Sequence, residues 1–95
     1  MPSHSDHNCY KDNGKNYRGT VSKTVTGVEC VAWNEQIFYK TVDYPELIGG
    51  HNYCRNPGGM DSQPWCFIKN LEMGRVLCDV PKCCELYDSL NVLFN

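Results

Sequence analysis

Seven cysteines in a chain of 95 residues constrain its fold more than any other feature of the sequence. Strongly apolar residues are scarce, since valine, isoleucine, leucine and phenylalanine together fill only 20 positions. That share is close to the level, roughly one fifth, below which chains tend to remain disordered. Because so thin a core gives little stability in a domain of this size, folding requires cross-links. We therefore predict one small domain stabilised by disulfides.

The spacing of the cysteines favours disulfides over a zinc site. Structural zinc sites use pairs of ligands a few residues apart, but the sequence contains no Cys-x-x-Cys. His4 and His7, with Asp6 and Cys9 nearby, are weak evidence for a metal site. We expect no metal and no cofactor, and the cysteine content indicates an oxidising compartment.

Length, charge and motifs exclude several classes of function. The formal net charge is -2 and the pI is near 5.8, so no basic surface is predicted for nucleic acid or an anionic membrane. No apolar run approaches the ~20 residues of a membrane span. The sequence has no Ser/His/Asp arrangement in a motif context, and its carboxylates are interpreted as surface charges. These carboxylates are Glu29, Glu35, Asp43 and Glu46. The chain is therefore predicted not to be an enzyme.

The sequence divides into three parts. Residues 1–8 are polar and lack the apolar core of a signal peptide, so we expect a flexible leader. Residues 9–83 carry the predicted domain. Residues 84–95 form a juxta-domain tail whose apolar residues fall at helical spacing. These are Leu86, Leu90, Leu93 and Phe94. Two interpretations are open for this tail: it leads to a membrane span outside this chain, or it has no role. A disulfide framework without an export signal indicates a piece of a longer secreted or cell-surface protein.

Frequent glycines divide the region from Cys9 to Cys83 into short segments, which disfavours helices of ordinary length. Enrichment in β-branched and aromatic residues predicts three strands. These are Thr20–Gly27, Trp65–Ile68 and Val76–Cys78.

The first six cysteines follow the frame Cys9-x20-Cys30-x23-Cys54-x11-Cys66-x11-Cys78-x4-Cys83. Five sequence blocks accompany them: Asn16–Thr20, Cys30–Trp33, His51–Pro57, Pro64–Phe67 and Cys78–Cys83. This arrangement resembles a kringle domain over the whole of residues 9–83. The resemblance implies a small disulfide-rich fold, irregular, with a few short antiparallel strands and three disulfides. The interval from Cys30 to Cys54 is a few residues shorter than usual, so we expect a trimmed loop there.

Six cysteines allow 15 pairings, and the residues alone do not choose among them. The kringle resemblance implies the pairs Cys9–Cys83, Cys30–Cys66 and Cys54–Cys78. Cys84 is left unpaired, which leaves two interpretations open: a bond to a cysteine outside the chain, or a free thiol.

Three further stretches narrow the resemblance to one branch of kringles. Tyr44–Gly58, Tyr17–Ser22 and Leu77–Pro81 are similar to the kringle of the Ror family, the receptor tyrosine kinase-like orphan receptors. The resemblance implies a non-catalytic ectodomain module on the cell surface, next to the single membrane span of a Wnt-type signalling receptor. It would act as a spacer or protein-interaction unit, with neighbouring receptor domains or a co-receptor as partners. Any kinase or pseudokinase domain would lie outside this chain.

Kringles of fibrinolytic proteins bind lysine side chains, with paired carboxylates for the ammonium and aromatic walls for the methylenes. The positions that match the carboxylate pair are Gly58 and Met60. Trp65 and Phe67 match two aromatic positions, and Arg75 replaces the far aromatic wall. We expect no binding of lysine analogues, because Arg75 would repel an ammonium and Asp61 is one position out of place. The alternative is a lysine-recognising regulatory kringle of a secreted serine protease or related plasma protein.

The other large rings are interpreted as structural. Trp65 and Phe67 are expected to pack around the central disulfides. Trp33 and Tyr53 lie close to cysteines of the frame and are expected in the core. His51 has no catalytic partner at suitable spacing, so a local hydrogen bond is predicted for it.

Overall fold

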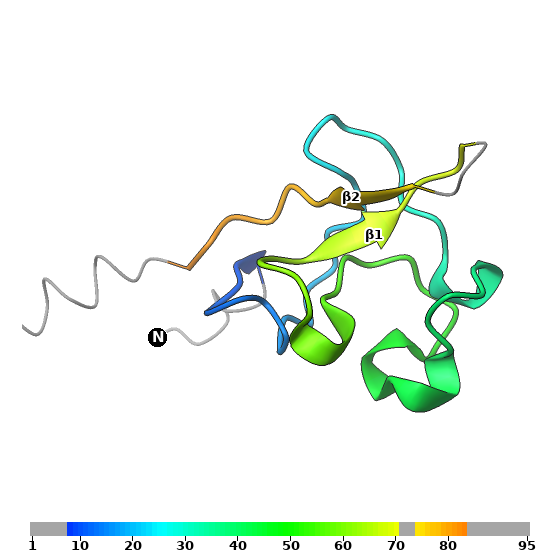
Figure 1. Cartoon of the computed structure of the whole chain (residues 1–95). Coiled ribbons are helices and arrows are strands. Elements are labelled where there is room, and N and C mark those ends of the chain that lie inside the picture. The colour runs from blue at the N-terminus through cyan, green and yellow to red at the C-terminus, as the bar shows by residue number, and fades with distance from the viewer. Residues whose placement is uncertain (1–7, 71–73, 84–95) are drawn as a thin grey trace, which may run out of the picture.

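The computed structural model describes residues 8–70 and 74–83 (Figure 1). Its regular elements are two strands and four single-turn 3-10 helices in the order η2 (Trp33–Glu35), η3 (Thr41–Asp43), η4 (Pro45–Leu47), η5 (Pro57–Gly59), β1 (Trp65–Phe67) and β2 (Arg75–Leu77). The strands form an antiparallel pair, with Cys66 opposite Val76. Irregular chain makes up most of the remaining described residues. The small, irregular, disulfide-rich fold expected from the sequence is confirmed.

Two of the three predicted strands are present, and the third is wrong. β1 lies inside Trp65–Ile68, and β2 lies one residue before Val76–Cys78. Between Thr20 and Gly27 the described chain makes only isolated bridges. The reason is a tight turn, in which the Gly27 N–H donates to the Thr24 carbonyl and the Val28 N–H donates to the Thr24 hydroxyl. The chain reverses there at a positive φ of Gly27, before a longer ladder can form.

Two disulfides cross at the centre of the domain. The bonds Cys30–Cys66 and Cys54–Cys78 are buried, and the Sγ of Cys30 lies 3.8 Å from that of Cys54. A third bond joins Cys9 to Cys83 and brings the two ends of the described domain together. These are the three pairs that the kringle resemblance implies.

Aromatic side chains share the core with the central disulfides and are its largest members. Trp33 and Trp65 are buried and meet edge to face, with ring centroids 5.3 Å apart. Phe67 packs against both rings. The Trp33 indole N–H donates to the Tyr53 carbonyl at 2.7 Å, so its polar atom is satisfied inside the core. Trp33 is therefore in the core as predicted, whereas Tyr53 is only half-buried.

Arg55 is a buried cation that ties two loops together. Its guanidinium donates to the carbonyls of Gly19 and Cys54, and it lies over the rings of Tyr17 and Tyr53. Burial lowers the pKa of Arg55 to about 10, so the group remains charged at neutral pH. The hydrogen bonds and ring contacts offset the cost of removing this charge from water.

His51 makes local hydrogen bonds, as predicted. Its Nδ1 lies 3.0 Å from the Tyr53 N–H, and its Nε2 lies 2.9 Å from the Glu46 carbonyl. Because the first partner can only donate and the second can only accept, the ring is the neutral tautomer protonated on Nε2. Burial lowers the pKa of His51, which agrees with this neutral form.

Several expectations lie outside the described residues. They concern the leader up to residue 7 with its histidines, the tail 84–95 and the state of Cys84. In residues 8–70 and 74–83, no helix has both the length and the apolar character needed to cross a membrane.

Candidate functional site

The β1–β2 pair fixes the positions of the candidate ligand site. Because side chains alternate across a strand, Trp65 and Phe67 lie on one face of β1. Arg75 is directly opposite Phe67 in the antiparallel register and therefore shares that face. We call the group formed by Trp65, Phe67, Arg75, Tyr39 and Asp61 the cradle.

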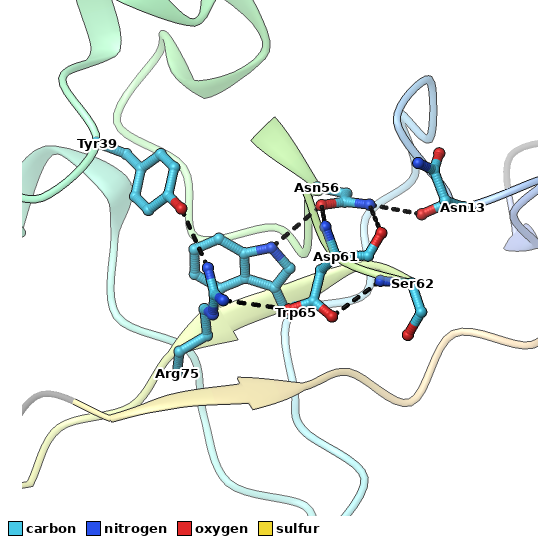
Figure 2. Close-up of polar contacts among 7 residues, drawn as sticks. All are labelled: Asn13, Tyr39, Asn56, Asp61, Ser62, Trp65 and Arg75. Carbon is cyan, nitrogen blue, oxygen red and sulfur yellow. Dashed lines mark hydrogen bonds and ion pairs between the residues drawn. The ribbon is translucent and has the colours of Figure 1, made fainter. Parts of the chain in front are cut away.

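The guanidinium of Arg75 lies on the aromatic part of the cradle. Its central carbon is 4.5 Å from the centroid of the Trp65 ring. One terminal nitrogen donates to the Tyr39 hydroxyl at 3.1 Å, and the other lies 3.5 Å from a carboxylate oxygen of Asp61. Figure 2 shows Arg75 between the indole, the phenol and the carboxylate. The cradle thus holds a cation from its own chain.

A fully buried amide positions the carboxylate. Asn56 accepts from the backbone N–H of Asp61 and donates to the backbone carbonyls of Asp61 and Asn13. Its Oδ1 also accepts from the Trp65 indole N–H at 3.3 Å. The Asp61 carboxylate accepts from the Ser62 N–H. This network fixes the loop after η5, so Asp61 is held beside Trp65 before any ligand arrives (Figure 2).

The two positions that match a carboxylate pair carry no charge. Gly58 is exposed, and its φ of +74° favours glycine. Met60 is one of the most exposed large hydrophobic residues of the described chain. Asp61 is therefore the only carboxylate that the described residues bring into the cradle, although the sequence places it one position out of register.

Trp65 and Phe67 are part of the packed core. Both are buried, and the Trp65 ring meets the rings of Trp33, Tyr39 and Phe67 in edge-to-face contacts. Arg75 covers the face of the Trp65 ring, so the cradle has no open aromatic floor.

Sequence reasoning missed the contributions of Tyr39 and Asn56. It also treated Asp61 and Arg75 separately, one as misplaced and the other as repelling a ligand. Opposite charges on either side of an aromatic strand were a usable signal for their pairing. Tyr39 gave no such signal, because it lies 36 residues from Arg75 in the sequence.

Four sulfur atoms at the centre of the domain have the proximity of a metal site. The Sγ atoms of Cys30, Cys54, Cys66 and Cys78 all lie within 4.8 Å of one another. All four are bonded in disulfides, so none is the thiolate that a metal requires.

A cavity of about 220 Å³ lies beside the Cys9–Cys83 bond, away from the cradle. It is lined by Cys9, Tyr10, Lys11, Asp12, Asn16 and Tyr17. It shares no residue with the cradle, so it adds nothing to the chemistry of Arg75.

The fold and its three disulfides together define a small, disulfide-closed module. The family model described as "Kringle domain" matches residues 9–83. The chain is 42% identical over 79 residues to the tyrosine-protein kinase transmembrane receptor Ror of Drosophila melanogaster, covering 82% of this chain and 11% of the receptor. It is 43% identical over 89 residues to human tissue-type plasminogen activator, covering 85% of this chain and 16% of that protein. This chain belongs to the kringle family.

Kringles are non-catalytic protein-interaction modules of receptors and proteases, so membership defines the general role of this chain. The chain spans only a small part of the curated relatives it matches. Any kinase activity of the receptor relative resides outside the matched region.

Proposed function

We propose that this chain is an extracellular kringle of a Ror-like cell-surface receptor that acts as a spacer or protein-interaction unit and does not bind lysine. The observation that carries the proposal is the position of Arg75. Its guanidinium covers the Trp65 ring and pairs with Asp61, where a lysine ligand would need an open ring and an unpaired anion.

Sequence identity does not distinguish between a kringle of a receptor and a kringle of a protease. The identities to the Ror receptor and to tissue-type plasminogen activator are 42% and 43%. The choice therefore depends on the chemistry of the cradle, and a cradle with an internal cation favours the receptor class.

The energetic balance is unfavourable for a lysine ligand. Each missing charge-assisted bond to a carboxylate removes about 1.5–3 kcal/mol. Cation–π attraction at an exposed site returns only about 0.5–1 kcal/mol. Micromolar affinity requires about -8 kcal/mol, which a ligand of this size does not reach without the anionic pair. The ligand would also have to displace Arg75 from Trp65 and Asp61.

The proposed extracellular location is supported by the family and by the disulfides. Three disulfides in a small domain are typical of extracellular modules. The name of the Ror relative describes a transmembrane receptor. These observations support a place in the extracellular part of a membrane receptor. The proposal extends this to a single-pass receptor with a Wnt-type signalling role, in which other receptor domains or a co-receptor are the partners.

One observation favours the protease-associated alternative. Asp61 is already fixed beside Trp65, and the Arg75 side chain that covers it is 41% exposed. A movement of Arg75 toward solvent would expose one anion next to an aromatic ring, which is a partial lysine site.

Calorimetric titration with ε-aminocaproic acid tests the proposal. We expect no saturable binding at millimolar ligand for the natural sequence. The triple variant Gly58→Asp, Met60→Asp and Arg75→Trp should gain measurable affinity, because it supplies two anions and an aromatic wall. The matched control replaces the same positions with Asn, Asn and Trp, which adds no charge and should not bind. Saturable micromolar binding by the natural sequence would return the protease-associated class to first place.

A further inference from the structure

The exposed apolar side chains of this domain are concentrated in one stretch. Seven large hydrophobic residues of the described chain are exposed, and four of them fall between residues 37 and 48. We call these four the loop patch: Ile37, Phe38, Val42 and Ile48. Ile37 and Val42 are 82% and 81% exposed. Several exposed apolar side chains in one short stretch are unfavourable in water on a domain with so thin a core, unless a partner covers them.

A buried amide holds the first half of the loop patch in place. The Gln36 side chain accepts from the backbone N–H groups of Phe38 and Tyr39 at 3.0 and 2.9 Å. Its amide nitrogen donates to the carbonyls of Trp33 and Tyr39. These four hydrogen bonds close a tight turn around Gln36 while Ile37 and Phe38 remain exposed. The exposure is thus built into an ordered turn.

The second half of the loop patch is carried by η3 and η4. These two turns pack against each other, and Leu47 of η4 is fully buried. Val42 lies in η3, and Ile48 follows η4 directly. The rings of Tyr39 and Tyr44, 5.5 Å apart, join this part to the turn around Gln36. The backbone that carries the loop patch is therefore ordered before a partner binds, which lowers the entropic cost of binding.

The surroundings of the loop patch are acidic. Residues 35–48 contain three carboxylates and one lysine, so their net charge of -2 equals that of the whole chain. Glu35 and Asp43 are exposed, and neither forms an ion pair within residues 8–70 and 74–83. Lys40 is the one basic residue of the stretch. A complementary partner would carry positive charge around its apolar contacts.

We propose that the loop patch with Glu35 and Asp43 is a docking surface for a protein segment that combines apolar anchors with lysine or arginine. This inference rests on the proposed function as an interaction unit and names the chemistry of the partner. A second copy of this chain fits poorly, because a symmetric contact would set the same carboxylates against each other. An anionic membrane surface would be repelled by the same charges.

Fluorescence anisotropy with a labelled synthetic peptide of leucine and lysine tests the surface, and a leucine–glutamate peptide of the same pattern is the comparison probe. The lysine peptide should bind saturably, about tenfold tighter than the glutamate peptide. The double variant Ile37→Ser and Val42→Ser should weaken binding about tenfold or more. Val25→Ser with Val28→Ser is the matched control, because those exposed valines lie outside the loop patch. The control should bind like the natural sequence.

The charges are tested separately. Glu35→Gln with Asp43→Asn should weaken binding of the lysine peptide and flatten its dependence on salt, because exposed charges are screened at higher ionic strength. All these variants alter exposed side chains, and near-UV dichroism checks that each is folded. No saturable binding below about 1 mM, equal binding of both peptides, or equal effects of the two double serine variants would each overturn the inference.

Competition with ε-aminocaproic acid separates this inference from the proposed function. Displacement of the peptide by that analogue would mean that the peptide occupies the cradle, and the proposed function would then fail. Binding that resists the analogue but ignores the Ile37 and Val42 substitutions would overturn only the docking surface.

Discussion

The cradle and the loop patch use similar side chains in opposite ways. In the cradle, Trp65 is buried, and its polar and charged neighbours contact it from within the same chain: Asn56 through a hydrogen bond and Arg75 over the ring. In the loop patch, Ile37 and Val42 are exposed beside carboxylates that have no ion pair in the described residues. The position where fibrinolytic kringles hold a ligand is thus satisfied internally, while a neighbouring surface is left open. The difference teaches that the position of the family's lysine site and the surface proposed here for docking are separate parts of the same domain.

The largest effect on stability is expected from loss of the disulfides, because both the cradle and the loop patch depend on them. The bonds span sequence separations of 74, 36 and 24 residues. Chain entropy assigns them about 4.5, 3.8 and 3.5 kcal/mol taken singly, which are upper values because the loops are nested. Full reduction should therefore unfold the domain, seen as loss of the near-UV dichroism signal. A native aromatic signal in the fully reduced chain would contradict the argument from the thin core.

A smaller effect should separate the two regions directly. Trp65→Ala should lower the free energy of unfolding by about 3–5 kcal/mol, because it empties a buried volume under Arg75. Ile37→Ala should change it by no more than about 0.5 kcal/mol, since that side chain packs on little. Denaturant unfolding with the disulfides intact measures both. If the two variants lost similar stability, the loop patch would be part of the core.

The smallest expected effect is a pH dependence through His51, which supports η4 by its contact with the Glu46 carbonyl. Burial lowers its pKa below the ordinary value of 6.5 in the folded state, so the unfolded chain binds more protons between the two values. Stability should therefore be fully present above pH 6.5 and fall as the pH drops through that value. Denaturant unfolding across this range measures the slope.

The control for this prediction is His51→Gln, compared with the natural sequence at each pH. His4 and His7 are present in both proteins, so the difference between the slopes isolates His51. Parallel pH profiles would show that His51 does not couple stability to protonation.

Much of the fold could be predicted because the spacing of the cysteines and the composition of the strands can be read directly from the sequence. The cysteine frame pointed to the kringle fold, and β-branched and aromatic runs located β1 and β2. The same composition failed at Thr20–Gly27, because the Thr24 side chain and Gly27 form a turn there. Strand propensity describes how well a side chain fits the pleated surface of a sheet. It does not include hydrogen bonds from a side chain to nearby backbone groups, which compete with the sheet.

The sequence predicted which charged groups the candidate site lacks, but it did not predict the contacts that the residues of the site make with one another. The missing carboxylates at Gly58 and Met60 and the cation at Arg75 are visible in the sequence. The contact of Arg75 with Trp65, Asp61 and Tyr39 depends on the β1–β2 register and on the loop fixed by Asn56. The register and the Tyr39 contact are tertiary features that no local pattern reveals. For the ion pair alone, the opposite charges on either side of the aromatic strand were a signal.

The Cys9–Cys83 bond has a mechanical consequence. The Cα atoms of these residues are only 4.8 Å apart, although 74 positions separate them in the sequence. Tension applied to the chain on either side of the domain would pass through this one covalent bridge and leave the interior unloaded. The domain would then neither stretch nor open under a pulling force that spares the bond. It would also add almost no reach between the segments that it joins, so what it contributes there is a rigid surface at a fixed point.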